Sequence, residues 1–146
     1  MSTTDWDNPR DPKLEWARDH VHRYVDSNGE DGHDWNGTKT LLLTTIGRKS
    51  GKAYRTPLIY GQDGDRYVVV ASKGGYPTHP QWYENLTANP EVRVQVGGDV
   101  FRARARTAGA DERQRLWELM LERWPAYDEY QEKTDREIPV VVLEGT

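Results

Sequence analysis

The chain has 146 residues, a net charge of −4 and no cysteine, which excludes disulfide bonds and thiolate metal sites. Leu, Ile, Val and Phe supply only 26 residues, a share below the ~20% under which disorder becomes a concern. The low net charge and the six Trp and eight Tyr residues nevertheless favour one folded domain with a small core. No apolar run approaches the ~20 residues of a membrane-spanning helix, and the acidic N-terminus is not typical of a signal peptide. We therefore expect a cytoplasmic protein without stable membrane insertion, although peripheral association with a membrane stays open.

The first expected element in chain order is a helix that starts at Pro12 and carries apolar residues as far as Val25. Asp11 is placed to cap this helix, with Pro12 in its first turn, and Asn28-Gly29 ends it. We assign residues 1–36 to this helix and a variable lead-in. Residues 37–146 then form the main part of a single domain.

The remainder of the chain alternates short β-rich runs with turn residues, and helices are few. The expected strands are 40–46, 54–60, 67–71, 92–96, 100–106 and 138–143. Expected helices begin at Pro80, at Asp111 and at Tyr127. Six strands without β-α-β alternation predict a mainly β (α+β) fold, an antiparallel barrel or rolled sheet with peripheral helices.

The charge is distributed unevenly along the chain. Residues 37–73 carry seven basic and two acidic side chains, whereas residues 1–36 and 111–146 each have five more acidic than basic ones. Such a protein is expected to bind a locally anionic small molecule, because its acidic parts would repel the phosphates of a nucleic acid.

Several common motifs are missing from the sequence. The segment Gly47–Lys52 has one residue too few for a phosphate-binding loop, and no GxGxxG or GxSxG sequence is present. The four histidines lack the spacing of metal ligands, so no metal site is expected.

Three nearby segments do suggest a binding site. The segment Gly47–Gly51 places two cations and a hydroxyl between glycines, where backbone N–H groups can converge on an anion. Arg55 follows across a predicted hairpin, residues 71–75 form a second small turn, and residues 79–83 add aromatic surface. This combination suits a flat heterocycle with a phosphorylated tail. Two ordinary turns beside a packed Trp would give the same pattern, so the residue types alone leave both interpretations open.

Longer stretches of the sequence resemble the deazaflavin-dependent nitroreductases, small actinobacterial reductases that use coenzyme F420. The resemblance covers roughly residues 35–144 and is carried by several motifs in the family's order and spacing. These motifs are LLLTTIGRKSG, RTPLIY, DGDRYVVVASKGG, HPQWYENLTANPEV and PAYDEYQEKTDREIPVVVLE. The resemblance implies a six-stranded split β-barrel, of the kind found in FMN-binding oxidases, over residues 37–146.

The resemblance also implies which residues hold the cofactor. The phosphate and acidic tail of F420 would be bound by Arg48, Lys49, Ser50, Arg55 and Thr56. The deazaflavin and ribityl chain would lie against Pro57, Leu58, Ile59, Val70, Ala71, Ser72, Lys73, Gln81, Trp82, Tyr83, Asn85 and Tyr127.

The expected reaction is hydride transfer from the reduced deazaflavin to a quinone, an enone or a nitro compound. Trp124, Tyr127 and Tyr130 would contact the substrate, and Ser72 or Tyr127, or else solvent, would supply the proton. Ile59 stands where reduction of bicyclic nitroimidazoles needs a tyrosine, so that activity is not expected. An FMN-dependent enzyme and a non-catalytic cofactor carrier are the alternatives, and a homodimer is expected by analogy.

Overall fold

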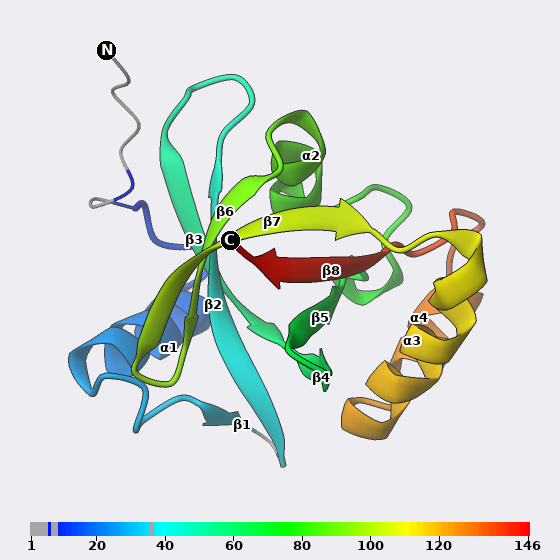
Figure 1. Cartoon of the computed structure of the whole chain (residues 1–146), viewed down its shortest axis with the longest axis horizontal. Coiled ribbons are helices and arrows are strands. Elements are labelled where there is room, and N and C mark those ends of the chain that lie inside the picture. Colours follow the sequence, from blue (N-terminus) through cyan, green and yellow to red (C-terminus); the bar gives the residue numbers. More distant parts are fainter. Residues whose placement is uncertain (1–5, 7–8, 36) are drawn as a thin grey trace.

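The computed structural model describes residues 6, 9–35 and 37–146, which form one antiparallel sheet with helices around it (Figure 1). The strands run in the order β1-β2-β6-β7-β8-β5-β4, and β3 pairs with β2. Their bounds are β1 Asp34–Trp35, β2 Thr38–Ile46, β3 Ala53–Ile59, β4 Gly61–Asp63, β5 Arg66–Val70, β6 Glu91–Val96, β7 Asp99–Thr107 and β8 Val140–Gly145. The helices are α1 Glu15–Asp26, α2 Gln81–Ala88, α3 Ala110–Arg123 and α4 Tyr127–Glu132, with a short 3₁₀ turn, Lys73–Gly75.

The expected antiparallel, curled sheet with peripheral helices is confirmed. All six expected strands are present within one or two residues of their predicted bounds, and the short strands β1 and β4 are added to them. Both additions are too short to leave an alternating pattern in the sequence. The division at residue 36 is not tested by this architecture and stays a prediction.

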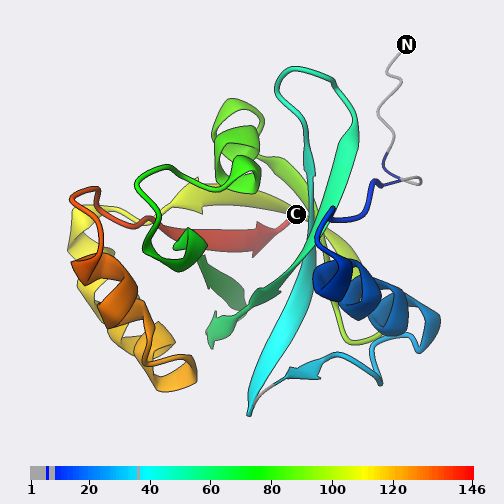
Figure 2. The same ribbon diagram turned by 180° about the vertical axis from the view of Figure 1, so that it is seen from behind.

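Strand β2 is buried on both faces, which explains its continuous apolar sequence. Leu41 and Leu43 pack into the interior of the curled sheet, whereas Leu42 on the opposite face contacts Val21 and Tyr24 of α1. The Tyr24 hydroxyl donates to the Thr40 carbonyl at 3.0 Å. Helix α1 is therefore attached to the outside of β2, as Figure 2 shows from behind.

Strands β5 and β8 are also covered on both faces. Val69 and Val141 belong to the interior core, and Val68 and Val142 pack under α3 and α4 with Trp117. The two helices lie at the end of the molecule opposite to α1 (Figures 1 and 2). Alternate valines in each strand thus pack into different hydrophobic cores, because successive side chains in a strand point to opposite faces.

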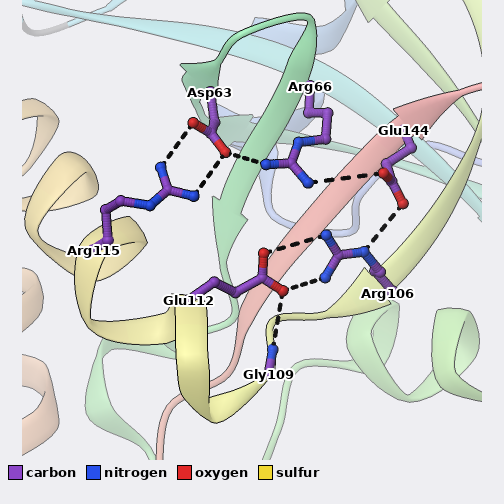
Figure 3. A network of polar contacts seen from close by, with 7 residues as sticks. All are labelled: Asp63, Arg66, Arg106, Gly109, Glu112, Arg115 and Glu144. Carbon is purple, nitrogen blue, oxygen red and sulfur yellow. Dashed lines mark hydrogen bonds and ion pairs between the residues drawn. The ribbon is translucent and has the colours of Figure 1, made fainter.

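A network of ion pairs joins the start of α3 to the sheet (Figure 3). Arg115 of α3 binds Asp63 at 2.8 Å, and Asp63 also binds Arg66. Arg106 of β7 binds Glu112 of α3 and binds Glu144 at 3.1 Å, and Arg66 approaches Glu144 at 3.9 Å. Most of these side chains are partly exposed, so we assign the network an orienting role with modest stabilisation.

The beginning of the first helix differs from the prediction. Helix α1 starts at Glu15, after Leu14, and no side chain caps it. Asp11 and Pro12 lie before the helix, and the Asp11 carboxylate is bound by Arg55 and His22. Asp11, which local sequence rules assign to the helix cap, therefore takes part in a long-range ion pair instead. The predicted end is confirmed, with Asn28 (φ 58°) and Gly29 (φ 90°) in the left-handed region.

Candidate active site

Two adjoining cavities lie along β3 and share Thr56 and Trp82 in their walls. We call the first the aromatic pocket; its volume is about 510 Å³. We call the second the basic pocket; its volume is about 670 Å³. Pro57 fits in β3 because this strand pairs with β2 along one side, and among the described residues its other side carries only a bridge to Arg10 at Tyr54. A residue without an N–H is tolerated at such an edge.

The aromatic pocket brings together most of the residues expected beside the cofactor ring and the substrate. They come from β3, from the segment after β5, from α2 and from the region of α4. They are Thr56, Pro57, Leu58, Ile59, Val70, Ser72, Lys73, Trp82, Trp124, Tyr127 and Tyr130.

Seven further residues line this pocket. Gly74 and Pro80 belong to the segments 71–75 and 79–83 that the sequence singled out, whereas Leu14, Trp16, His20, Trp35 and Thr40 were not predicted. Trp16 and Trp35 stack at 6.3 Å between ring centroids, and Trp35 lies 5.6 Å from Trp124. The spacing of Trp16, His20 and Tyr24 by four residues places all three rings on one face of α1. This row of aromatic residues is the sequence feature that could have indicated that α1 contributes to the pocket.

The basic pocket collects the residues expected to hold an anionic tail. Arg48, Lys49 and Ser50 come from the turn after β2, and Arg55 and Thr56 from β3. Gln81 and Asn85 of α2, which were expected beside the deazaflavin, also line this basic pocket. Arg10, Asp11 and Lys13 also line this pocket and were not predicted.

Arg48 is held in place by the helix beside it. One guanidinium nitrogen donates to Gln81 at 2.9 Å and to Asn85 at 3.0 Å, and the other binds Glu84 at 3.3 Å. The side chain of Asn85 is buried and also donates to the Thr45 hydroxyl at 3.3 Å. Gln81 and Asn85 therefore orient a cation at the pocket wall.

Arg55 already has an anionic partner inside the protein. It binds Asp11 at 2.8 Å, and His22 binds the other oxygen of this carboxylate at 2.8 Å. Burial by itself would raise the pKa of Asp11, but hydrogen bonds and charges from Arg55 and His22 hold it below its ordinary value. Arg10 pairs with β3 through backbone hydrogen bonds, which brings the N-terminal segment to the pocket.

The turn between β2 and β3 offers an anion fewer backbone donors than the sequence suggested. The N–H groups of Gly47, Arg48, Gly51 and Lys52 are all used within the protein. The Ser50 hydroxyl lies 3.0 Å from the Tyr54 hydroxyl. Lys49, by contrast, is exposed and has no carboxylate within 4.0 Å among the described residues. Anion binding at this turn therefore depends on side chains.

The two candidate proton donors both reach the aromatic pocket. Tyr127 is only 5% exposed, and its burial raises its pKa above the ordinary tyrosine value. Neither the Tyr127 hydroxyl nor the Ser72 hydroxyl has a hydrogen-bond partner within the described part of the chain. Both are consequently available to a ligand, and the Tyr127 hydroxyl keeps its proton at physiological pH.

Two of the expected cofactor residues line neither cavity. Ala71 is fully buried behind the pocket wall. Tyr83 directs its hydroxyl to Thr107 at 2.8 Å and packs its ring 4.8 Å from that of His79.

The comparison with protein families agrees with this geometry. Residues 16–145 match the family model described as F420H(2)-dependent quinone reductase. The chain belongs to this family. An F420H(2)-dependent quinone reductase of Mycobacterium tuberculosis is 43% identical over 134 residues, which cover 89% of this chain and 90% of that protein. A second, putative member from the same organism is 44% identical over 104 residues and covers 71% of this chain and 87% of the relative.

Solved structures agree with the family assignment. One described as a domain-swapped dimer is 42% identical, has a TM-score of 0.71, and covers 89% of this chain and 98% of its own. A structure described as an F420-H2 dependent reductase is 48% identical with a TM-score of 0.67, over 72% of this chain and 93% of its own. A putative pyridoxamine 5'-phosphate oxidase from Listeria innocua, at 16% identity and a TM-score of 0.52, shares the fold alone.

Proposed function

We propose that this member of the family is an F420H2-dependent reductase whose substrate is an electron-poor quinone. The observation that carries the proposal is the junction, at Thr56 and Trp82, of one cavity rich in aromatic side chains and one rich in basic side chains. F420 has a flat deazaflavin at one end and a phosphodiester with glutamates at the other. The two cavities match these two ends in order and in chemistry.

Within this proposal the basic pocket binds the tail. Arg48, Lys49 and Arg55 face its phosphate and carboxylates, and Ser50 adds a hydroxyl. Each of these hydrogen bonds is strengthened by the opposite charges of its partners, and salt weakens it by screening those charges. The Asp11 carboxylate competes with the tail for Arg55, since both are anions within reach of one guanidinium.

The ring would lie in the aromatic pocket along Pro57–Ile59, with Trp82 where the pockets join. When bound, the reduced cofactor supplies a hydride. The indole of Trp124 and the phenols of Tyr127 and Tyr130 give a flat acceptor a stacking surface on the pocket wall. Tyr127 or Ser72 donates a proton to the oxygen of the reduced substrate, because each has a hydroxyl free for a ligand.

Three further expectations belong to the same proposal. A related structure described as a domain-swapped dimer supports a homodimer for this chain. Among the described residues, no helix has both the length and the apolar character needed to cross a membrane. We place the protein in the cytoplasm, and cell fractionation tests whether part of it associates with membranes.

The test of the function is a fluorescence titration of the protein with oxidised F420, and with FMN in parallel at the same ionic strength. Saturable, salt-sensitive binding of F420 in preference to FMN is the expected result. Oxidation of F420H2 that depends on added menadione, a soluble quinone, then distinguishes an enzyme from a cofactor carrier. Preference for FMN, or binding without turnover, would overturn the proposal.

A further inference from the structure

Arg136 lies outside the walls of both pockets, yet it makes four contacts to the loop that follows β5. These contacts run from a single guanidinium, whose planar group carries five N–H donors. The guanidinium binds the carbonyls of Ser72 at 2.7 Å, Tyr76 at 2.8 Å and Ala71 at 3.3 Å, and ring nitrogen Nδ1 of His79 at 3.1 Å.

The charge of Arg136 has no carboxylate counterion within 4.0 Å in the described part of the chain. Its neighbour Glu137 pairs with Arg113 at 3.6 Å instead. A partly buried cation is costly unless several acceptors surround it. The carbonyl oxygens of the loop are these acceptors, so the Arg136 side chain is held against the loop.

The loop itself has a backbone that needs support. Lys73 has a φ of 48°, and Gly74 and Gly75 follow with φ of 62° and 84°. The left-handed region costs a residue with a Cβ roughly 1 kcal/mol. A Cβ at Gly75 would lie 2.6 Å from the Tyr130 carbonyl oxygen, so the loop also fits closely against α4.

The contacts of Arg136, together with the Gly75 N–H that donates to the Ser72 carbonyl at 3.0 Å, fix the direction of two peptide groups. In a trans peptide the C=O and the N–H point in opposite directions. Because the Ala71 and Ser72 carbonyls point to Arg136, the N–H groups of Ser72 and Lys73 point away from it. Neither N–H has a hydrogen-bond partner among the described residues, although both residues line the aromatic pocket. Two unpaired donors at a pocket wall are a ready site for a ligand's acceptors.

We propose that Arg136 is a positioning residue, which holds these two peptides so that the Ser72 and Lys73 N–H groups donate to the polar edge of the deazaflavin ring. This inference rests on the proposed function. Arg136 itself contacts neither cofactor nor substrate. Its effect reaches the ring through the backbone, and the tail in the basic pocket does not depend on it.

The experiment separates ring binding from tail binding with two probes, F420 and the tailless deazaflavin 8-hydroxy-5-deazariboflavin. Arg136→Met should weaken the binding of both probes by about tenfold, the equivalent of two ordinary hydrogen bonds. It should leave the salt dependence of F420 binding unchanged. Lys49→Ala should weaken F420 alone. The affinity of Arg136→Lys for both probes should lie between those of the wild type and Arg136→Met, because an ammonium group cannot reach all the same acceptors. Arg104→Met, an exposed arginine on β7, is the matched control and should bind both probes normally.

The visible absorption band of the bound tailless probe gives a second readout, because hydrogen bonds to the ring shift it. Circular dichroism of each variant checks the fold. Normal binding of the tailless probe by folded Arg136→Met would overturn the inference, and if that variant does not fold, normal binding by Arg136→Lys would do so. A wild-type protein that binds neither probe would instead refute the proposed function.

Discussion

Asp11 and Arg55 form an ion pair at 2.8 Å, although 43 residues separate them in the chain. The pair joins the N-terminal segment to β3 at the wall of the basic pocket. It thus links the part of the sequence with the least recognisable pattern to a residue expected to bind the cofactor.

Asp11→Asn should destabilise the protein by about 1 kcal/mol at neutral pH, since the pair is only partly exposed. The folded-state pKa of Asp11 lies below its unfolded value of 3.8. The stabilisation is therefore present above that value and is lost as the pH falls through the folded-state pKa. Urea unfolding at pH 7 and near pH 3 measures it. Asp19→Asn, on the exposed face of α1, removes the same charge and should not change the free energy of unfolding. Equal destabilisation by the two variants would contradict a stabilising role of the Asp11–Arg55 pair.

Lys49→Ala should weaken F420 binding by roughly tenfold, the loss of one charge-assisted contact. The plot of log Kd against log salt concentration should become shallower, because fewer charges take part. Lys52→Ala is the matched control, since Lys52 lies in the same turn but outside the basic pocket. A tail that binds elsewhere would leave the two variants indistinguishable.

Trp35→Ala should raise the KM for menadione by about threefold to tenfold, in line with ~0.5–1.5 kcal/mol for an aromatic pair. The reason is that Trp35 bridges Trp16 and Trp124 in the wall of the aromatic pocket. Steady-state kinetics measure the change. Trp6→Ala serves as the control, because that ring packs on Arg93 outside both pockets. An unchanged KM would show that the substrate does not reach this wall.

Tyr127→Phe should lower kcat at least tenfold if the phenol donates the proton, given the usual scale of general acid catalysis. Burial raises the pKa of Tyr127, so its loss of a proton should not reduce wild-type activity below pH 10. Tyr130→Phe, whose hydroxyl accepts a hydrogen bond from Trp124, is the comparison. A normal kcat in Tyr127→Phe would assign the proton to Ser72 or to solvent.

Much of the candidate site could be predicted because the motifs that carry the family resemblance are short and local. Arg48 to Ser50 lie in one turn, Thr56 to Ile59 in one strand, and Ser72 and Lys73 directly after another. Turns, short strands and their order leave a signal within a few residues. The exceptions are Ala71 and Tyr83, which were expected beside the cofactor but face the interior and Thr107.

The N-terminal contribution to both pockets could not be predicted. Asp11 satisfies the local rule for a helix cap, but a guanidinium on β3 competes for the same carboxylate. Arg136 likewise has no local pattern that distinguishes it from other arginines. Its four acceptors lie 57 to 65 residues earlier in the chain.

From its residues alone, this chain specifies a small antiparallel fold, a basic central segment and the motifs of an F420-binding family, because these depend on neighbours along the chain. Tertiary structure decided that Trp16, Trp35 and Trp124 meet in the wall of one pocket and that Arg136 binds the Ser72 carbonyl. Such contacts depend on how the sheet curls and on which face each helix packs against. Those arrangements are set by the burial of whole surfaces rather than by any short run of residues.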